Sequence, residues 1–153
     1  MRRLDLAAAD TVQFTQMVRK FRFFGALRME VLERVLGGLH LYAFDRGEKV
    51  CSEGQPGDSF FVVQRGRLSV TRRAGRILGS RKVAVLEPGD CFGEMALLDQ
   101  TPRNATVACL EPSRVFVLPA RHFQGVMEQN PEFAQEIRGL AELRQFELDH
   151  GKD

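Results

Sequence analysis

Apolar positions near the start of the chain recur with the period of an α-helix. There are two such sets, Phe14, Met17, Val18 and Phe21 in the first and Val31, Leu32, Val35 and Leu36 in the second. Asp10, three residues before Gln13, forms a start of the capping-box type for the first helix. The Gly37-Gly38 pair after the second set predicts a left-handed helix stop. Residues 1–38 are therefore expected to form an N-terminal helical segment.

From residue 39 the apolar pattern becomes that of short β-strands. Up to Leu118 the apolar runs are rich in β-branched and aromatic residues, and they read LHLYAF, KVC, FFVVQ, LSVT, KVAVL, ATVACL and RVFVL. Glycine-bearing turns separate nearly all of these runs. Seven or eight short strands at this spacing predict an antiparallel sandwich or barrel over residues 39–118.

Helical signals return after the strands. Residues 119–127 form a short amphipathic segment, and the Asn-Pro-Glu sequence at 130–132 combines an N-cap, a first-position proline and a first-turn acid. We expect the last helix to run to about Leu148. Its barrel-facing residues would be Phe133, Ile137, Leu140, Ala141 and Leu148. The expected fold is mainly β with flanking helices (α+β): one domain, an antiparallel β-roll or jelly-roll barrel, with hinge and lid helices over 119–149.

The composition fits one domain that has no broad attraction to polyanions. A chain of 153 residues with 44% hydrophobic content can fill a single core. Lys and Arg number 22 against 20 Asp and Glu, so no summed field favours nucleic acid or an anionic membrane. Neither a run of about 18 apolar residues nor a secretory signal is present. Three cysteines without C-x-x-C spacing indicate buried, reduced thiols, so we expect a cytoplasmic protein.

The segment that carries chemistry lies between two expected strands, at residues 92–107, and reads FGEMALLDQTPRNATV. Gly93 lets the backbone approach a ligand closely, and a helical turn from Glu94 would point free N–H groups at an anion. Arg103 can reach the same anion with a forked pair of hydrogen bonds. Glu94 would repel a phosphate, but it suits hydroxyls beside one, such as a ribose 2′-OH. A phosphate next to a ribose describes a nucleotide.

This segment resembles the phosphate-binding cassette of the cyclic-nucleotide-binding domain family, which reads F-G-E-hydrophobic-A-L, a short gap, then P-R-x-A-[ST]-V. It matches at every fixed position, and the similarity extends through the expected strands to the G-x-x-G-D run at 54–58 and the P-G-D at 88–90. The resemblance implies that Glu94 binds the ribose 2′-OH and that Arg103 binds the cyclic phosphate. It also implies contacts to ribose and phosphate from Gly93, the amides of Met95 and Ala96, Asn104 and Ala105, apolar contacts from Ala84, Leu86 and Val107, and stacking on the purine by Arg144 or else Arg138.

Other functions compete with this interpretation. A metal-dependent enzyme of the barrel class needs clustered histidine and carboxylate ligands, whereas His40, His122 and His150 lie far apart in the sequence. We therefore expect a sensor without catalytic activity, metal or cofactor. A transcription factor would need a helix-turn-helix after the last helix, and the sequence ends at Asp153. A fragment of a larger regulated transcription factor, channel or kinase, and a ligand-free interaction barrel, are the alternatives that stay open.

The residue after the cassette arginine bears on which nucleotide binds. In the family this position is often Ala or Ser where cyclic AMP binds, and Thr in cyclic-GMP-dependent kinases. Asn104 departs from all three and leaves cyclic GMP open, although we favour cyclic AMP. We expect no nucleic acid or membrane partner for this chain alone. A homodimer or an effector protein could bind the C-terminal helix, because Leu143 and Phe146 project away from its barrel-facing stripe.

Overall fold

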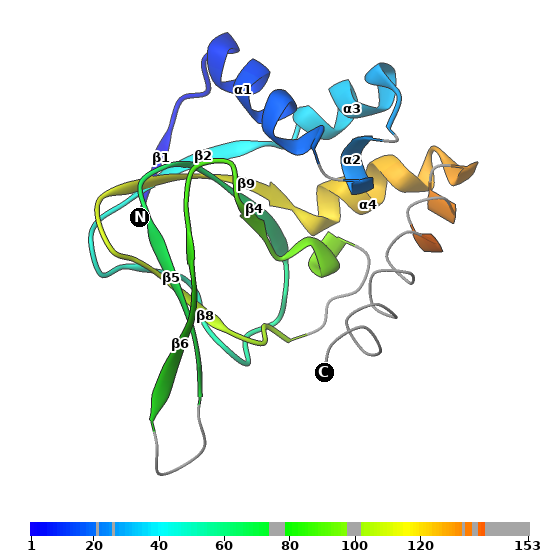
Figure 1. The fold of residues 1–153 in the computed structure, drawn as a ribbon. Helices are drawn as coiled ribbons and strands as arrows, with labels where there is room; N and C mark the ends of the chain where they lie inside the picture. Colours follow the sequence, from blue (N-terminus) through cyan, green and yellow to red (C-terminus); the bar gives the residue numbers. More distant parts are fainter. Residues whose placement is uncertain are drawn as a thin grey trace.

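Two antiparallel sheets form a β-roll, as shown in Figure 1. The computed structural model describes residues 1–20, 22–25, 27–73, 79–97, 102–132, 134, 135, 138 and 139. The first sheet has the order β1-β2-β9-β4-β7 and the second the order β3-β8-β5-β6. The strands are β1 (Arg2–Leu4), β2 (His40–Phe44), β3 (Lys49–Cys51), β4 (Ser59–Arg65), β5 (Leu68–Arg73), β6 (Ser80–Leu86), β7 (Cys91–Phe92), β8 (Thr106–Cys109) and β9 (Ser113–Pro119). The predicted roll is confirmed, and its two sheets do not close into one barrel.

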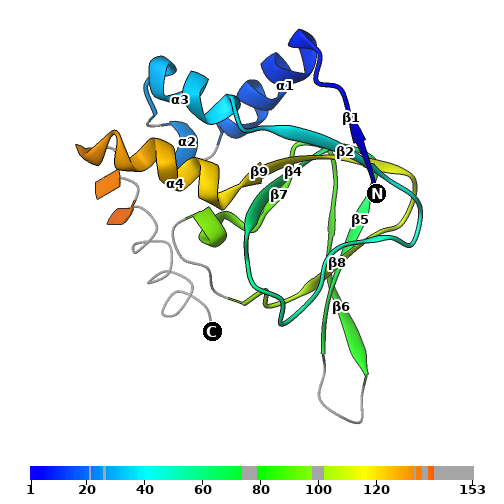
Figure 2. The same cartoon turned by 180° about the vertical axis from the view of Figure 1, so that it is seen from behind.

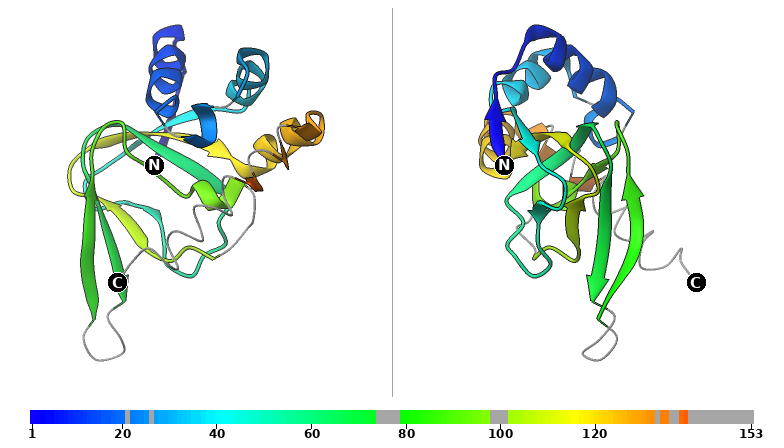
Figure 3. Two further views of the ribbon diagram at one scale, coloured as in Figure 1. Left: turned by 45° about the vertical axis from the view of Figure 1, so that its right-hand side comes forward. Right: turned by 90° about the vertical axis from the view of Figure 1, so that its left-hand side faces the viewer.

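The helices gather on one side of the roll (Figure 3). They are α1 (Ala8–Val18), α2 (Arg22–Gly25), α3 (Met29–Leu36) and α4 (Ala120–Glu128), with a 3-10 turn η1 (Glu94–Leu97) between β7 and β8. Three of them match predicted helices, whereas the short α2 was not predicted. No helix in the described ranges is both long and apolar enough to cross a membrane.

Two predicted helix ends are wrong in detail. The N-cap of α1 is Ala7, and Asp10 lies at the third helical position, where its Oδ2 accepts a hydrogen bond from the Ala7 amide at 2.9 Å. Asp10 therefore caps the helix from inside. The end of α3 is not left-handed, because its C-cap Gly37 has a φ of −62° and Gly38 is not among the positive-φ glycines.

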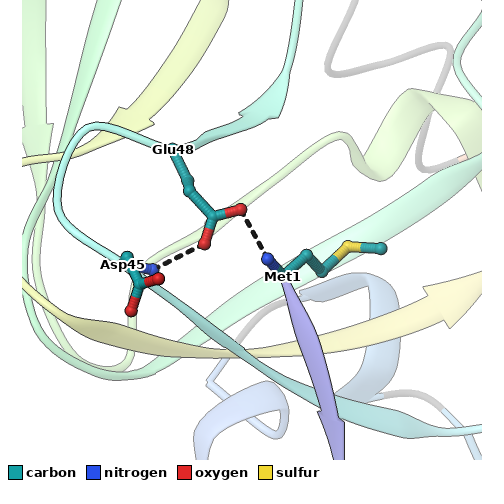
Figure 4. A network of polar contacts seen from close by, with 3 residues as sticks. All are labelled: Met1, Asp45 and Glu48. Atoms are coloured by element: carbon teal, nitrogen blue, oxygen red, sulfur yellow. Dashed lines mark hydrogen bonds and ion pairs between the residues drawn. The ribbon is translucent and has the colours of Figure 1, made fainter.

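An N-terminal strand extends the first sheet. β1 pairs antiparallel with β2, with Arg2 opposite Ala43 and Leu4 opposite Leu41. Figure 4 shows how its start is held: the Met1 amino group donates to Oε2 of Glu48, whose Oε1 accepts from the Asp45 amide at 2.8 Å. The Asp45 amide and, next, the amino group lower the pKa of Glu48.

Strand alternation gives the first sheet two buried faces. Leu41, Phe116 and Val62 pair across the sheet and point to the helices, where Phe116 meets Phe14 of α1 at a ring distance of 5.3 Å. Tyr42, Val115 and Val63 are the next residues along, and they face the second sheet. One β-sheet thus separates a helical core from the interior of the roll.

The chain after α4 is described only in part. Residues 131, 132, 134, 135, 138 and 139 are helical, and the Ala134 amide donates to the Asn130 carbonyl at 3.1 Å, as expected for a helix start. The predictions for Leu143, Arg144, Phe146 and the end at Leu148 lie outside the described residues.

Candidate functional site

The first part of the cassette forms a tight turn directly after β7. Gly93 has a φ of +82°, a conformation that favours glycine, and η1 begins directly after it. The Ala96 amide donates to the Gly93 carbonyl at 3.0 Å, and Ala96 and Leu97 are buried. The Ala96 amide thus forms its hydrogen bond within the turn. The side chains of Glu94 and Met95 lie outside the described part.

Arg103 reaches back from the far end of the cassette to lie against Gly93. A Cβ placed on Gly93 would be 2.3 Å from Nη1 of Arg103 and 2.9 Å from the carbonyl oxygen of Ser59. Nη2 of Arg103 donates to that same oxygen at 2.6 Å. Only the missing side chain of Gly93 makes room for this guanidinium.

The guanidinium is buried and has limited charge compensation. The Arg103 side chain is 8% exposed, and its Nη2 lies 3.8 Å from Oδ1 of Asp58, whose own side chain is 82% exposed. Its Cζ lies 5.1 Å from the ring centroid of Phe61, which stacks on Phe92 at 4.7 Å. A buried cation that is so weakly compensated is costly, and a bound anion would offset that cost.

The G-x-x-G-D loop at 54–58 holds Arg103 by its backbone. The Gly54 amide donates to the Arg103 carbonyl at 2.8 Å, and the Arg103 amide donates to the Gln55 carbonyl at 2.7 Å. The Glu53 amide donates to Oγ1 of Thr106 at 3.0 Å, which ties the same loop to β8. This run is part of the family resemblance, but the sequence did not predict that it belongs to the site. Asp58 at the end of the run could have indicated this role, because a carboxylate is a natural partner for the cassette arginine.

A cavity of about 300 Å³ opens beside the guanidinium. Arg103, Asp58, Phe61 and Cys51 are among its lining residues. Burial raises the pKa of the Cys51 thiol, and the nearby Arg103 partly opposes that change. Phe61 and Cys51 of the cavity wall, and Ser59, which binds Arg103 through its carbonyl, were missed from the sequence, because nothing local distinguishes them from ordinary strand residues.

The predicted apolar contacts lie on one face of the second sheet. Val70 pairs with both Ala84 and Val107, and Leu68 pairs with Leu86, so these side chains share a face. Val107 is buried, Leu86 is half-buried and Ala84 is exposed.

The remaining predicted residues lie at the end of the cassette or away from it. Asn104 is exposed directly after Arg103, and Ala105 is buried. Arg138 lines a separate hollow with Leu97 and α4, away from the Arg103 cavity. Arg144 lies outside the described residues. Among the described residues, the fold brings Gly93 and Arg103 together from the two ends of the cassette.

Comparison with known proteins identifies relatives that have named functions. The profile of the cyclic nucleotide-binding domain matches residues 42–130. A cyclic nucleotide-gated potassium channel of Mesorhizobium japonicum is 31% identical over 137 residues, which cover 90% of this chain and 36% of the channel. A cAMP-dependent protein kinase regulatory subunit of Yarrowia lipolytica is 29% identical over 151 residues, 94% of this chain and 39% of the subunit. The chain thus spans well under half the length of these relatives.

Solved structures show the same fold. The N-terminal domain of a Streptomyces coelicolor transcriptional regulator has a TM-score of 0.73 and 27% identity, covering 90% of this chain and 96% of that domain. The regulatory domain of Toxoplasma gondii PKA, crystallised with cAMP, has a TM-score of 0.72 and 26% identity, covering 80% of this chain and 46% of that one. Because the family profile covers more than half of the sequence, the chain belongs to the cyclic nucleotide-binding domain family.

Proposed function

We propose that this chain is a sensor module that binds one cyclic nucleotide, with cyclic AMP preferred over cyclic GMP. The observation that carries the proposal is the buried guanidinium of Arg103, held against Gly93 beside a cavity of about 300 Å³. In the proposed complex Arg103 binds the cyclic phosphate and Glu94 accepts a hydrogen bond from the ribose 2′-OH.

The hydrogen bonding of Arg103 supports this role for its guanidinium. Among the described residues only Nη2 donates, to Ser59, so Nη1 and Nε keep their donors for a ligand. Two neighbouring N–H groups of a guanidinium match two phosphate oxygens in a forked geometry. The bond to Ser59 and the ring of Phe61 hold the group in place before the ligand arrives. A binding group that is already positioned loses little conformational entropy when the phosphate binds.

Two relatives support the preference for cyclic AMP. The Yarrowia relative is named for cAMP, and the Toxoplasma domain was crystallised with it. Ala84 offers a small exposed surface on the wall of the second sheet, which suits an apolar contact with either base. Asn104 is exposed beside Arg103, where its amide group can meet either the phosphate or the edge of a base.

The proposed role is regulatory, without catalysis or a cofactor. The relatives are a gated channel and a kinase regulatory subunit, in which this domain occupies 36% and 39% of the length. We propose that the helix after α4 passes the signal to a second copy of the chain or to an effector protein. A ligand-free interaction module is the alternative, and it does not explain why a buried arginine lies beside an open cavity.

Calorimetry with variants at Arg103 tests the proposal. Removing a desolvated charged partner costs about 2 to 5 kcal/mol, so Arg103→Ala should weaken cyclic AMP binding by about thirtyfold or more. Arg103→Lys should also weaken binding, because the forked pair of donors is lost, but it should do so less than Arg103→Ala, because the charge is kept. Arg67→Ala is the matched control. This exposed arginine follows the C-terminal end of β4, whereas Ser59 begins the strand.

Two outcomes would contradict the proposal. One is an absence of binding of either cyclic nucleotide to wild-type protein that is shown to be free of copurified ligand. The other is an Arg103→Ala variant that binds within about threefold of the Arg67→Ala variant.

A further inference from the structure

A second cleft, separate from the cavity beside Arg103, lies where α3 meets α4. It has a volume of about 700 Å³ and is lined by the end of α3, the start of β2 and one side of α4. The two helices contact each other, and Figure 2 shows them on the helical side of the roll. The cleft shares no lining residue with the cavity beside Arg103.

The described ionisable side chains that line this cleft are all basic. Arg34, His40, Arg121 and His122 line it, and its described lining residues include no aspartate or glutamate. Within the described ranges neither Arg34 nor Arg121 forms an ion pair. The chain as a whole is nearly balanced, at 22 basic and 20 acidic residues, so this is a local excess of positive charge.

The start of α4 lacks the negative charge that a helix N-terminus favours. The N-cap Pro119 provides no side-chain cap, and the first turn has no acidic residue. Arg121 and His122 occupy that turn instead. Basic groups there oppose the helix dipole, whereas an anion in the cleft would interact favourably with both the dipole and the two side chains.

The two histidines are arranged around the same space. Nε2 of His122 lies 2.7 Å from the Arg34 carbonyl oxygen, and it must donate because a carbonyl only accepts. A Cβ on Gly38 would lie 2.2 Å from Cγ of His122, so the imidazole fits only because residue 38 is glycine. Nδ1 of His40 is buried and has no hydrogen-bond partner among the described residues. The cleft therefore has a fixed imidazole and an unsatisfied one.

We propose that this cleft is a second binding site, which takes a small dianionic oxyanion such as the phosphate group of a free phosphorylated metabolite. Arg34 and Arg121 supply permanent charge, and His122 is held in place by α3. The site does not depend on cyclic nucleotide binding. Because it joins α3 to α4, which itself contacts η1 of the cassette, an anion bound there would stabilise the helical side of the domain.

Binding should strengthen as the pH falls. The pKa of His40 is lowered by burial first, and then by Arg3 and His122. Besides Arg3 and His122, the cleft that His40 lines has Arg34 of α3 and Arg121 of α4 among its residues, and the ring centroid of Tyr42 lies 6.3 Å from that of His40. The ring is therefore mainly neutral at pH 7 in the free protein. A bound dianion favours the protonated ring, so protons and anion bind cooperatively.

Imidazole NMR on the intact chain tests the site directly. The sequence has three histidines, so the ring signals of His40 and His122 can be assigned by substitution. Sulfate is the first probe, because it stays dianionic between about pH 5.5 and 8, and inorganic phosphate is the second. Chloride holds the ionic strength constant, so screening alone does not change during the titration.

Saturable shifts of both rings are expected with either oxyanion, and sulfate should bind more tightly at pH 6 than at pH 8. Arg121→Gln and Arg34→Gln should each weaken binding by about fivefold or more, and Arg67→Gln by less than about twofold. Shifts that do not saturate would overturn the proposal, because they indicate an adventitious ion only. Affinities that Arg121→Gln and Arg34→Gln leave unchanged would overturn it as well, and an equal affinity for sulfate at both pH values would overturn the role of His40.

Discussion

Gly93→Ala is the substitution for which the structure makes the sharpest prediction. Gly93 has a φ of +82°, and a Cβ there would lie 2.3 Å from Nη1 of Arg103 and 2.9 Å from the Ser59 carbonyl oxygen. The backbone oxygen has little freedom, so the guanidinium must move away. Losing one hydrogen bond from a charged group costs about 1.5 to 3 kcal/mol. Cyclic AMP binding should therefore weaken by about 10- to 150-fold.

Gly89→Ala is the matched control for this experiment. Gly89 has a φ of +93°, but a Cβ there would have no neighbour within 4 Å. Both variants should lose about 1 to 2 kcal/mol of stability from the left-handed backbone alone. Urea unfolding measures that loss, and calorimetry at one salt concentration measures affinity.

The result expected is two variants of comparable stability, of which only Gly93→Ala binds poorly. A folded Gly93→Ala protein that binds cyclic AMP within about threefold of Gly89→Ala would refute the reasoning. It would mean that the position of the guanidinium against residue 93 does not matter for the ligand.

Three further predictions concern the ribose, the base and the histidine in the second cleft. Glu94→Gln should weaken cyclic AMP binding by about 1.5 to 3 kcal/mol, and removing the 2′-OH of the ligand should cost that variant little further affinity. If calorimetry shows that the two losses simply add, Glu94 does not contact the 2′-OH. Asn104→Thr should move the ratio of the two dissociation constants towards cyclic GMP, and Asn104→Ala towards cyclic AMP; an unchanged ratio in both would place base recognition elsewhere. Because the pKa of His40 is lowered from 6.5 in the fold, the unfolded chain takes up its proton first as the pH falls. Stability should thus drop below about pH 6.5, and His40→Gln should reduce that drop in urea titrations at pH 7.5 and 5.5 in chloride; equal drops would contradict the assignment.

Local pattern was sufficient for most of the elements. The strands between residues 39 and 118, except the two-residue β7, were predicted because alternation and glycine turns are local signals, and Gly47, Gly66 and Gly89 have positive φ. The α4 helix was predicted from the amphipathic pattern of residues 119–127, which is also a local signal. The short β1 strand was missed, because it contains one apolar residue at Leu4 and exists through pairing with β2, some forty residues away. Propensity contains no information about such a partner.

The Gly37-Gly38 pair shows why a correct motif can receive the wrong explanation. Two glycines after an amphipathic run predict a left-handed stop from local preference alone. In the fold, a Cβ on Gly38 would collide with the ring of His122, which comes from a helix more than eighty residues later. Here glycine allows close packing of two elements, and that requirement is visible only when both are in place.

For the site, the sequence alone identified the cassette, its glycine and its arginine, because these residue types at this spacing match the cassette of the cyclic nucleotide-binding domain family. It did not determine what surrounds Arg103. Ser59, Phe61 and Asp58 lie on other segments, and their distances to the guanidinium follow from the pairing of β4 with β9 and β7 and from the loop at 54–58. A motif of neighbouring residues can be recognised from the sequence alone. The burial of a side chain and the charges around it depend instead on which distant segments the fold brings together. Tertiary structure alone decided that Arg103 is buried and weakly compensated, and that two arginines and two histidines meet between α3 and α4.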